Sequence, residues 1–408
     1  MVLNKEQQKA FDLIKEGNSV LLTGSAGTGK SFTLSEIISW AHKNKKNIGV
    51  TATTGSAAIL IKGRTIHSYL GIGLGTKTAA QLASYVIQNS KYVLNRLRNL
   101  DILIIDEISM LDAELFSKIS EFLSIIRMNT APFGGVQIVL CGDFAQIAPV
   151  GKNAEYCFKS NIWSAANIIT INLKTIIRQK DDLEFIEILE CLRWGKCTKS
   201  ILERLQKLQN TVFDSDILPT HLYGRNINVD VINQSHFSKL VEYGAATKTY
   251  NTKYSKNAKI WADSCKVQPE IQLCIGAQVV LTWNVDQELG LVNGSRGIIT
   301  GFDINGPIVK FKNHPDGILI SYVNITNEDN KTDQITFMPI KLAWAITHHR
   351  AQGMTLDSCI IDLSSWSSGQ AYTALSRVRD LKSVKLIGEI NPKFFKLHKD
   401  VLEFYNKI

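Results

Sequence analysis

A glycine-rich segment near the start of the chain, GSAGTGKS at 24–31, combines residue types and a spacing that bind phosphate groups. Glycines let successive backbone N–H groups turn inward around an anion, and a helix that follows adds the partial positive charge of its N-terminus. In this spacing Lys30 should reach the β- and γ-phosphates, and the Ser31 hydroxyl should bind Mg²⁺. We therefore predict a site for ATP and Mg²⁺ formed by Gly24, Gly27, Thr28, Gly29, Lys30 and Ser31.

Two adjacent carboxylates, Asp106 and Glu107, directly follow the apolar run ILII at 102–105. They should emerge at the carboxyl end of a strand, where ligands bind in open α/β sheets. Asp106 is expected to hold Mg²⁺ through water, and Glu107 to act as general base on the attacking water. Two acids at a strand end can also be simple caps, but beside a phosphate loop in the same domain they predict nucleotide hydrolysis.

These residues need a scaffold that brings the ends of several strands together. Short apolar runs alternate with helical stretches through the first 175 residues, at 20–24, 48–52, 102–107 and 136–143. Continuous apolar strands separated by helices indicate a parallel sheet that is covered on both faces. The first domain, residues 1–175, is therefore predicted to be α/β.

The remaining chain changes character twice. Amphipathic spacing predicts two helices over 181–210, and a strand at 218–224 precedes a further helix. From 244 to 337, short strands broken by Gly, Asn, Pro and Asp turns predict a small antiparallel β insert. An α/β pattern resumes near Ile360, so the second domain is expected to comprise 176–243 and 338–408.

The composition is that of a globular protein with several domains. The chain has 408 residues, of which 45% are hydrophobic and 20% are charged. Its formal net charge of +9 favours a polyanionic partner, although proteins without one often carry a similar surplus. The 7 cysteines are scattered, with no paired C-x-x-C spacing, and are interpreted as reduced thiols. The N-terminus is amphipathic rather than a signal peptide, and no apolar run approaches the roughly 18 residues of a membrane span. We expect an intracellular protein without a membrane partner.

Further motifs, in the same order along the chain, resemble those of superfamily 1B DNA helicases of the Pif (petite integration frequency) family. The resemblance runs from Leu3 to about Leu386. LNKEQ at 3–7 resembles the family's Q motif, and 111–150 is similar to its signature segment joined to motif III, which is the most specific match. The resemblance implies two RecA-like P-loop domains, with an SH3-like β insert in the second.

The resemblance also assigns nucleotide contacts to residues far from the phosphate loop. Gln7 would bond the adenine edge, and Gln146 would sense the γ-phosphate. Arg178 in motif IV and Arg377 in motif VI would stabilise the transferring phosphoryl group, while motif V supplies Gln352 and Gly353. With Lys30, Asp106 and Glu107, the implied catalytic set is complete. The two arginines can meet the nucleotide only if the second half of the chain folds over the first, so that one closing and opening of the cleft becomes one step along DNA.

Motifs Ia and Ib of the family contact single-stranded DNA, and 50–58 and 63–75 resemble them. Phe144, in motif III, is a candidate for stacking on bases, as is Tyr69. The implied DNA contacts are Thr51, Thr53, Thr54, Gly55, Thr65, His67, Ser68, Phe144, His348 and His349. Two motifs depart from the family pattern. Ile147 and Ala148 replace the first Leu-Pro of the Leu-Pro-Pro end of motif III, and Arg350-Ala351 replaces Lys-Ser in motif V.

The implied function is ATP-dependent 5′-to-3′ translocation on single-stranded DNA by a monomer, with unwinding of partly duplex DNA. The resemblance extends this to G-quadruplex substrates and to replication, repair, recombination and telomere maintenance. Three alternatives stay open from the residues. The first is a ring-forming ATPase, which would take its arginine finger from a neighbouring subunit. The second is a DNA-binding scaffold that has lost its motor, which would have a damaged site. The third is an RNA helicase.

Overall fold

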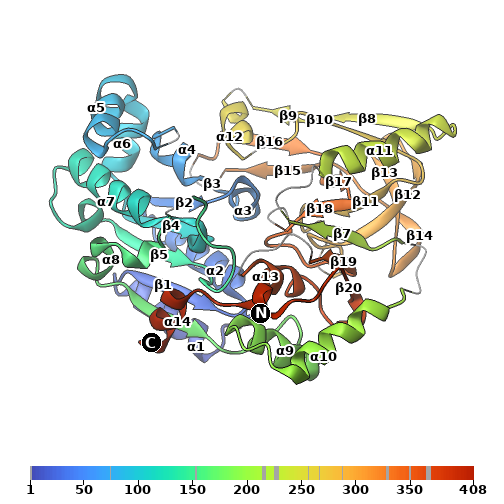
Figure 1. Cartoon of the computed structure of the whole chain (residues 1–408). Coiled ribbons are helices and arrows are strands. Elements are labelled where there is room, and N and C mark those ends of the chain that lie inside the picture. Colours follow the sequence, from blue (N-terminus) through green and yellow to red (C-terminus); the bar gives the residue numbers. More distant parts are fainter. Residues whose placement is uncertain are drawn as a thin grey trace.

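Two parallel sheets flanked by helices, together with smaller antiparallel sheets, form the molecule (Figure 1). The computed structural model describes residues 2–73, 75–151, 154–213, 217–224, 229–255, 257–265, 267–286, 288–327, 330–348, 351–363 and 369–408. The α/β class predicted from the alternation of apolar runs and helical stretches is confirmed.

The first sheet has six strands in the order β3-β2-β4-β5-β1-β6, and every neighbouring pair is parallel. All residues of β1, β2 and β4 are buried, because helices cover both faces of the sheet. The four apolar runs expected to be strands all belong to it. Its strands are β1 Val20–Gly24, β2 Ile48–Ala52, β3 Arg64–Thr65, β4 Ile102–Asp106, β5 Gln137–Cys141 and β6 Ile169–Leu173.

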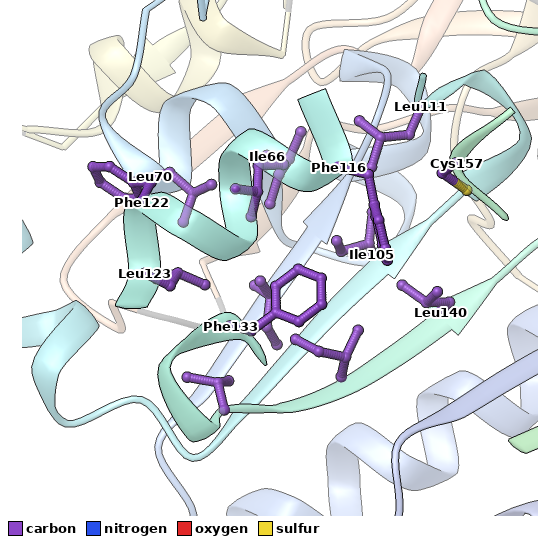
Figure 2. Packing of buried hydrophobic residues seen from close by; sticks show 14 of the residues in the cluster. Ile66, Leu70, Ile105, Leu111, Phe116, Phe122, Leu123, Phe133, Leu140 and Cys157 are labelled. Atoms are coloured by element: carbon purple, nitrogen blue, oxygen red, sulfur yellow. The ribbon is translucent and has the colours of Figure 1, made fainter. Parts of the chain in front are cut away.

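An apolar cluster lies on each face of this sheet. Figure 2 shows the cluster beneath α7, where Phe116 lies over Ile105 of β4 and Phe122 lies beside Leu70 of α4. The cluster on the opposite face joins α1 and α2 to the strands. The helices of this half are α1 Lys5–Lys15, α2 Lys30–Lys43, α3 Gly55–Leu60, α4 Ile66–Leu70, α5 Ala79–Asn89, α6 Lys91–Arg98, α7 Ala113–Arg127 and α8 Asn161–Ala165.

The second parallel sheet has four strands in the order β18-β7-β19-β20. The two helices expected over 181–210 are α9 and α10, and the strand expected at 218–224 is β7. The strands are β7 Thr220–Tyr223, β18 Ala345–Thr347, β19 Cys359–Asp362 and β20 Val384–Ile387. The helices are α9 Leu183–Arg193, α10 Lys199–Lys207, α11 Val229–Glu242 and α13 Gln370–Leu375.

The segment between β7 and β18 contains three antiparallel sheets, with strand orders β14-β13-β12-β11-β17, β15-β16-β9 and β10-β8. β17 pairs with β11, so this unit continues past residue 337, where the sequence placed its end. Its elements are β8 Thr247–Asn251, β9 Lys253–Tyr254, α12 Ala258–Ser264, β10 Glu270–Cys274, β11 Gln278–Leu281, β12 Arg296–Phe302, β13 Pro307–Phe311, β14 His314–Leu319, β15 Val323–Thr326, β16 Gln334–Phe337 and β17 Ile340–Leu342.

The antiparallel unit is attached to the first half of the chain by a buried contact. Trp261 of α12 is fully buried, and its indole N–H donates to the carbonyl of Gly63 at 2.7 Å. Next to it, Arg64 and Asp333 form a buried ion pair. Apolar residues of α3 and α12 complete the contact. This unit therefore packs on both halves of the molecule rather than on the second alone.

The C-terminal helix α14, Lys399–Asn406, returns to the first half of the chain. Its Val401 and Tyr405 belong to the apolar cluster that α7 covers. In Figure 1, α14 accordingly lies on the side of β1 and α1, away from β19 and β20. The sequence had placed 338–408 as one part of the second domain, and α14 departs from that assignment because its apolar face is buried against the first.

Short 3₁₀ turns complete the helical structure, at Ile108–Met110, Pro132–Gly135, Cys157–Lys159, Leu208–Asn210, Leu381–Ser383 and Pro392–Phe395. None of the helices in the described part of the chain combines the length and the apolar character that crossing a bilayer requires.

Candidate functional site

The glycine-rich loop at 24–31 joins β1 to α2, as the sequence predicts. Gly27 has a φ of 83°, a conformation that side-chain-bearing residues rarely adopt. A Cβ at Gly27 would lie 2.7 Å from the Cβ of Arg178, so the second half of the chain approaches the loop closely. Lys30 Nζ donates to the carbonyl oxygen of Gly24 at 2.7 Å. Binding of phosphate by Lys30 would replace this internal hydrogen bond.

The acidic pair lies at the carboxyl end of β4. Asp106 is 8% exposed, and its Oδ1 accepts the backbone N–H of Glu107 at 2.9 Å. Glu107 has a φ of 55°, in the left-handed region, where a non-glycine residue costs on the order of 1–3 kcal/mol. The Thr53 hydroxyl donates to the Glu107 carbonyl oxygen at 2.9 Å. A residue of the predicted DNA motif therefore supports the strained peptide that carries the expected general base.

Burial shifts the charges of this site away from their ordinary values. Burial, followed by the neighbouring Asp106, raises the pKa of Glu107 to about 7, although Arg377 and Lys30 act in the opposite direction. Burial also raises the pKa of Asp106 and lowers that of Lys30. A carboxyl group with a pKa near neutrality is suited to take a proton from water.

The donor atoms at this site fit Mg²⁺. The Ser31 hydroxyl is exposed at the start of α2, and the Asp106 carboxylate lies at the end of β4. Mg²⁺ prefers oxygen donors and is commonly held by one or two protein groups together with substrate phosphates. The described residues contain no group of three or more His, Cys, Asp or Glu side chains that could hold a metal without phosphate. A cation near Asp106 would also offset the cost of ionising this buried carboxyl.

Gln352 connects the second half of the chain to the expected general base. This side chain is 3% exposed, and its Nε2 donates to Glu107 Oε2 at 2.7 Å. It follows β18 of the second sheet, so the hydrogen bond spans the two halves. The sequence placed Gln352 and Gly353 beside the nucleotide. The structure brings the Gln352 amide to Glu107, while a Cβ at Gly353 would meet Leu60 of α3 at 2.9 Å.

Arg178 is half-buried against the phosphate loop, and Arg377 is buried near Glu107 of the acidic pair. Arg178 donates to the Ser376 carbonyl oxygen at 2.9 Å, and its backbone N–H donates to the Gly27 carbonyl oxygen at 3.2 Å. Arg377 is 3% exposed and donates through Nε to the Thr373 carbonyl oxygen at 2.8 Å. Burial, followed by the charges of Arg377 and Arg379, lowers the pKa of Arg178 to about 9. An anion such as a phosphoryl group would relieve this concentration of positive charge.

The two predicted glutamines are both buried, and Gln7 lies against the loop. Gln7 is 2% exposed, and a Cβ at Gly29 would lie 2.6 Å from its Nε2. A capping box at the start of α1 holds Gln7, because Asn4 and Gln7 exchange side chain-to-backbone hydrogen bonds. Gln146 is 5% exposed and follows β5 in a turn closed by the hydrogen bond from its N–H to the Asp143 carbonyl oxygen. The adenine and γ-phosphate contacts assigned to them remain predictions.

A groove of about 890 Å³ runs between α3 of the first half, α11 of the second half and the antiparallel unit. Five predicted DNA contacts line it, namely Thr53, Thr54, Gly55, Thr65 and His67. Ser68 is half-buried, and its backbone N–H donates to the Thr65 hydroxyl at 3.4 Å at the start of α4. Gln352 also lines the groove, so the residue whose amide bonds Glu107 forms part of the wall of the predicted DNA path.

The predicted base-stacking aromatic residues are core residues instead. Phe144 is fully buried, with its ring centroid 4.8 Å from that of Phe158 and 5.2 Å from that of Phe404. Tyr69 is 1% exposed, and the guanidinium of Arg96 lies 4.2 Å from its ring centroid. Neither ring can stack on a base without opening the core, so the prediction of DNA contact was wrong for both.

Two further predicted DNA contacts are also buried. Thr51 is fully buried within β2, and its hydroxyl donates to the Ile104 carbonyl oxygen at 2.5 Å. His348 is fully buried, with Nδ1 3.3 Å from the Tyr223 carbonyl oxygen. Direct contact of their side chains with DNA is therefore ruled out in this arrangement. His349 lies outside the described residues.

Sequence reasoning missed the polar residues that the second half contributes to the groove. Gln234 of α11 and Lys341 of β17 line it, and neither belongs to a motif that the sequence identified as contacting DNA. A smaller cavity of about 470 Å³ adjoins the groove at Thr53 and His67. A polar residue in a helix or a short edge strand has no spacing that distinguishes it from an ordinary surface residue, so these positions could not be found from the sequence.

Comparison with known proteins shows similarity to one helicase family over most of the chain. Residues 2–202 match the PIF1-like helicase family, and residues 263–302 match the family described as DNA helicase Pif1, 2B domain. The chain is 32% identical to the ATP-dependent DNA helicase Pif1 of Bdellovibrio bacteriovorus, covering 99% of this chain and 92% of that protein. It is 35% identical to the ATP-dependent DNA helicase PIF1 of Danio rerio over its whole length, and spans 64% of that relative.

Solved structures of the Bacteroides sp. Pif1 helicase are similar along the whole chain. The complex with ADP-AlF4 has a TM-score of 0.84 at 29% identity, covering 100% of this chain and 97% of that one. The complex with ADP-AlF3 and single-stranded DNA has the same coverages and identity but a TM-score of 0.69. The arrangement of this chain is therefore closer to the first of these two structures.

Proposed function

The chain belongs to the PIF1-like helicase family of ATP-dependent DNA helicases, and on that premise we propose that it moves 5′ to 3′ along single-stranded DNA and unwinds the duplex ahead. The observation that carries this proposal is the meeting of both halves of the chain at one cleft. The phosphate loop and acidic pair come from the first half, and Gln352, Arg178 and Arg377 come from the second.

In this proposal ATP is hydrolysed by groups that already lie together. Lys30 binds the β- and γ-phosphates, and Ser31 and Asp106 hold Mg²⁺, which offsets negative charge on the phosphate oxygens. Glu107, whose pKa is raised to about 7, accepts the proton of the attacking water. Gln352 orients Glu107 through their 2.7 Å hydrogen bond.

The two arginines make hydrolysis depend on the contact between the halves. Arg178 and Arg377 would stabilise the charge of the transferring phosphoryl group, an effect worth about 10³–10⁵ in rate for an arginine finger. Because both lie in the second half, opening of the cleft after hydrolysis removes them from the phosphate. The groove that holds DNA is lined by both halves, so opening and closing would move one DNA-binding surface relative to the other.

Direction of movement is tested by displacement of streptavidin from biotinylated oligonucleotides. A 5′-to-3′ motor should displace streptavidin from a biotin at the 3′ end in an ATP-dependent reaction and leave a 5′ biotin occupied. Displacement from the 5′ end alone would contradict the proposed direction.

We propose that one chain is sufficient for hydrolysis, because both arginines are supplied in cis. The ATPase activity per molecule, measured with excess single-stranded DNA, should then stay constant when the enzyme is diluted. A specific activity that rises with enzyme concentration would favour a ring-forming ATPase.

The preferred nucleic acid is tested with the same ATPase assay. DNA should stimulate hydrolysis more than RNA of the same sequence, and the reverse preference would favour an RNA helicase.

A further inference from the structure

A buried cluster of polar side chains joins the C-terminal helix to the nucleotide site. Its centre is Asp143, which is fully buried in the loop that leads from β5 to Gln146. Arg193 of α9 donates to both carboxylate oxygens, with Nε–Oδ2 at 3.0 Å and Nη2–Oδ1 at 3.1 Å. The Tyr405 hydroxyl of α14 donates to Oδ1 at 2.9 Å. One carboxylate therefore joins its own loop to two other segments of the chain, α9 and α14.

The hydrogen-bonding capacity of the Tyr405 hydroxyl is fully used. A phenol has one proton and two lone pairs. Its proton goes to Asp143, and its oxygen accepts the backbone N–H of Phe144 at 3.2 Å. The Thr23 Oγ1 lies 2.7 Å away and must be the donor in that pair. Thr23 immediately precedes the first glycine of the phosphate loop, so this hydroxyl ties the loop to the segment that carries Gln146.

The same cluster reaches the arginine of the second half. The Tyr372 hydroxyl accepts the backbone N–H of Ala26, inside the phosphate loop, at 3.0 Å. Tyr372 lies in α13, five residues before Arg377. Its hydroxyl is also 3.5 Å from Asp143 Oδ2. A displacement of Asp143 would therefore disturb both the phosphate loop and α13, the helix that precedes Arg377.

Charge is concentrated at this cluster. Burial alone would raise the pKa of Asp143, but Arg193 and Lys30 outweigh burial and hold the pKa below its ordinary value. In return, the negative charge of Asp143 opposes the effect of burial on Lys30. The ionised Asp143 thus supports the ammonium group that is to meet the phosphates, and its donors keep it ionised.

We propose that the Tyr405 hydroxyl is a positioning group for ATP hydrolysis, which makes α14 a working part of the nucleotide site. This inference rests on the proposed ATPase function. The hydroxyl holds Asp143 against the phosphate loop, and Asp143 in turn holds the segment that carries Gln146. Loss of the hydroxyl leaves Asp143 with one donor fewer, and it leaves the Phe144 N–H and the Thr23 hydroxyl without their shared acceptor. The fold remains, but the phosphate loop and the segment that carries Gln146 are no longer held in fixed positions relative to each other.

The test is DNA-stimulated ATP hydrolysis by Tyr405→Phe, which removes one oxygen atom from the full-length chain. We expect kcat to fall about tenfold, the change that corresponds to about 1.4 kcal/mol, which is close to the lower end of the range of about 1.5–3 kcal/mol for one hydrogen bond to a charged group. KM for ATP and the affinity for single-stranded DNA should change less than about twofold. If Tyr405→Phe fails to fold, Thr23→Val serves as the second variant, because it removes the hydroxyl that donates to Tyr405. Its kcat should also fall.

Two control variants separate positioning from general stability. Tyr92→Phe removes the same atom from a side chain that is 57% exposed, and it should behave as the wild type. Val401→Ala weakens the packing of α14 without touching the polar cluster, because Val401 is fully buried and apolar. It should lower the unfolding temperature and retain the wild-type kcat.

The outcomes are distinguishable from a failure of the proposed function. If the wild-type chain does not hydrolyse ATP with DNA, the proposed function itself is wrong. If the wild type is active and Tyr405→Phe retains its kcat, the positioning role is overturned. The role is also overturned if Val401→Ala loses kcat to the same extent as Tyr405→Phe, since undocking of α14 would then explain both results.

Discussion

Replacing Gln352 by leucine tests whether the second half of the chain controls the general base. Gln352→Leu nearly preserves the volume of a side chain that is 3% exposed and removes the amide that donates to Glu107 Oε2 at 2.7 Å. Glu107 keeps its place at the end of β4, because the Thr53 hydroxyl bond to its carbonyl oxygen is unaffected. The variant therefore changes the environment of one carboxylate oxygen.

The magnitude follows from the energy of a hydrogen bond to a charged group, about 1.5–3 kcal/mol. If the bond persists in the transition state, kcat/KM for ATP should fall about 10- to 150-fold at pH 7. The base must be ionised to accept a proton, so activity is lost as the pH falls through the pKa of Glu107, which is about 7. The amide favours the ionised form of Glu107, so its loss should raise the pKa of Glu107, and activity should then be lost at a higher pH than in the wild type.

The assay is ATP hydrolysis with saturating single-stranded DNA, measured at low ATP concentration from about pH 6 to pH 9. Gln88→Leu is the matched control, since Gln88 is exposed on α5 and far from the acidic pair. It should reproduce the wild-type profile. A Gln352→Leu enzyme with the wild-type rate and the wild-type pH limb would refute the coupling of Gln352 to Glu107.

Three further variants test other parts of the account. Lys30→Ala should abolish ATP hydrolysis while single-strand binding, followed by fluorescence anisotropy, stays detectable; retained turnover would contradict the phosphate-loop assignment. Phe144→Ala should lower the free energy of unfolding by about 3–5 kcal/mol in a denaturant titration, with unchanged DNA affinity of the folded protein. Weaker DNA binding at unchanged stability would restore the base-stacking hypothesis. Arg64→Ala should cost about 3–5 kcal/mol of unfolding free energy because it leaves the buried Asp333 unpaired, and Arg64→Met with Asp333→Leu should recover part of this loss. Equal unfolding free energies of the single and double variants would contradict the proposed cost of leaving Asp333 buried without its partner.

Much of the first half could be predicted because its signals are local. The run before Asp106 is apolar at every position, and the run before Gly24 is apolar except for Thr23, as expected for strands covered on both faces; both became buried strands. The spacing of the phosphate loop depends only on adjacent residues. Motif order then placed Arg178 and Arg377 in the second half, and in the structure Arg178 lies against the loop and bonds Ser376, the neighbour of Arg377.

The predictions that failed depend on contacts between distant segments. Phe144 has a motif position next to the nucleotide site, but Phe404 covers it from a helix about 260 residues later. β17 is only three residues long, and its place is set by pairing with β11 rather than by its own pattern. The apolar face of α14 is visible in the sequence, yet nothing local indicates which sheet it covers. Burial of this kind is fixed by the tertiary fold and leaves no signal in residue spacing.

The central claim is that ATP hydrolysis in the cleft between the two halves drives directional unwinding of DNA. It is tested most directly by strand displacement from duplexes that carry a single-stranded tail at either the 5′ or the 3′ end. The wild-type chain should separate the 5′-tailed duplex with ATP, and it should fail without ATP, with a non-hydrolysable analogue, or when Glu107 is replaced by Gln. Unwinding of the 3′-tailed duplex alone, or unwinding that proceeds equally without ATP hydrolysis, would contradict the account.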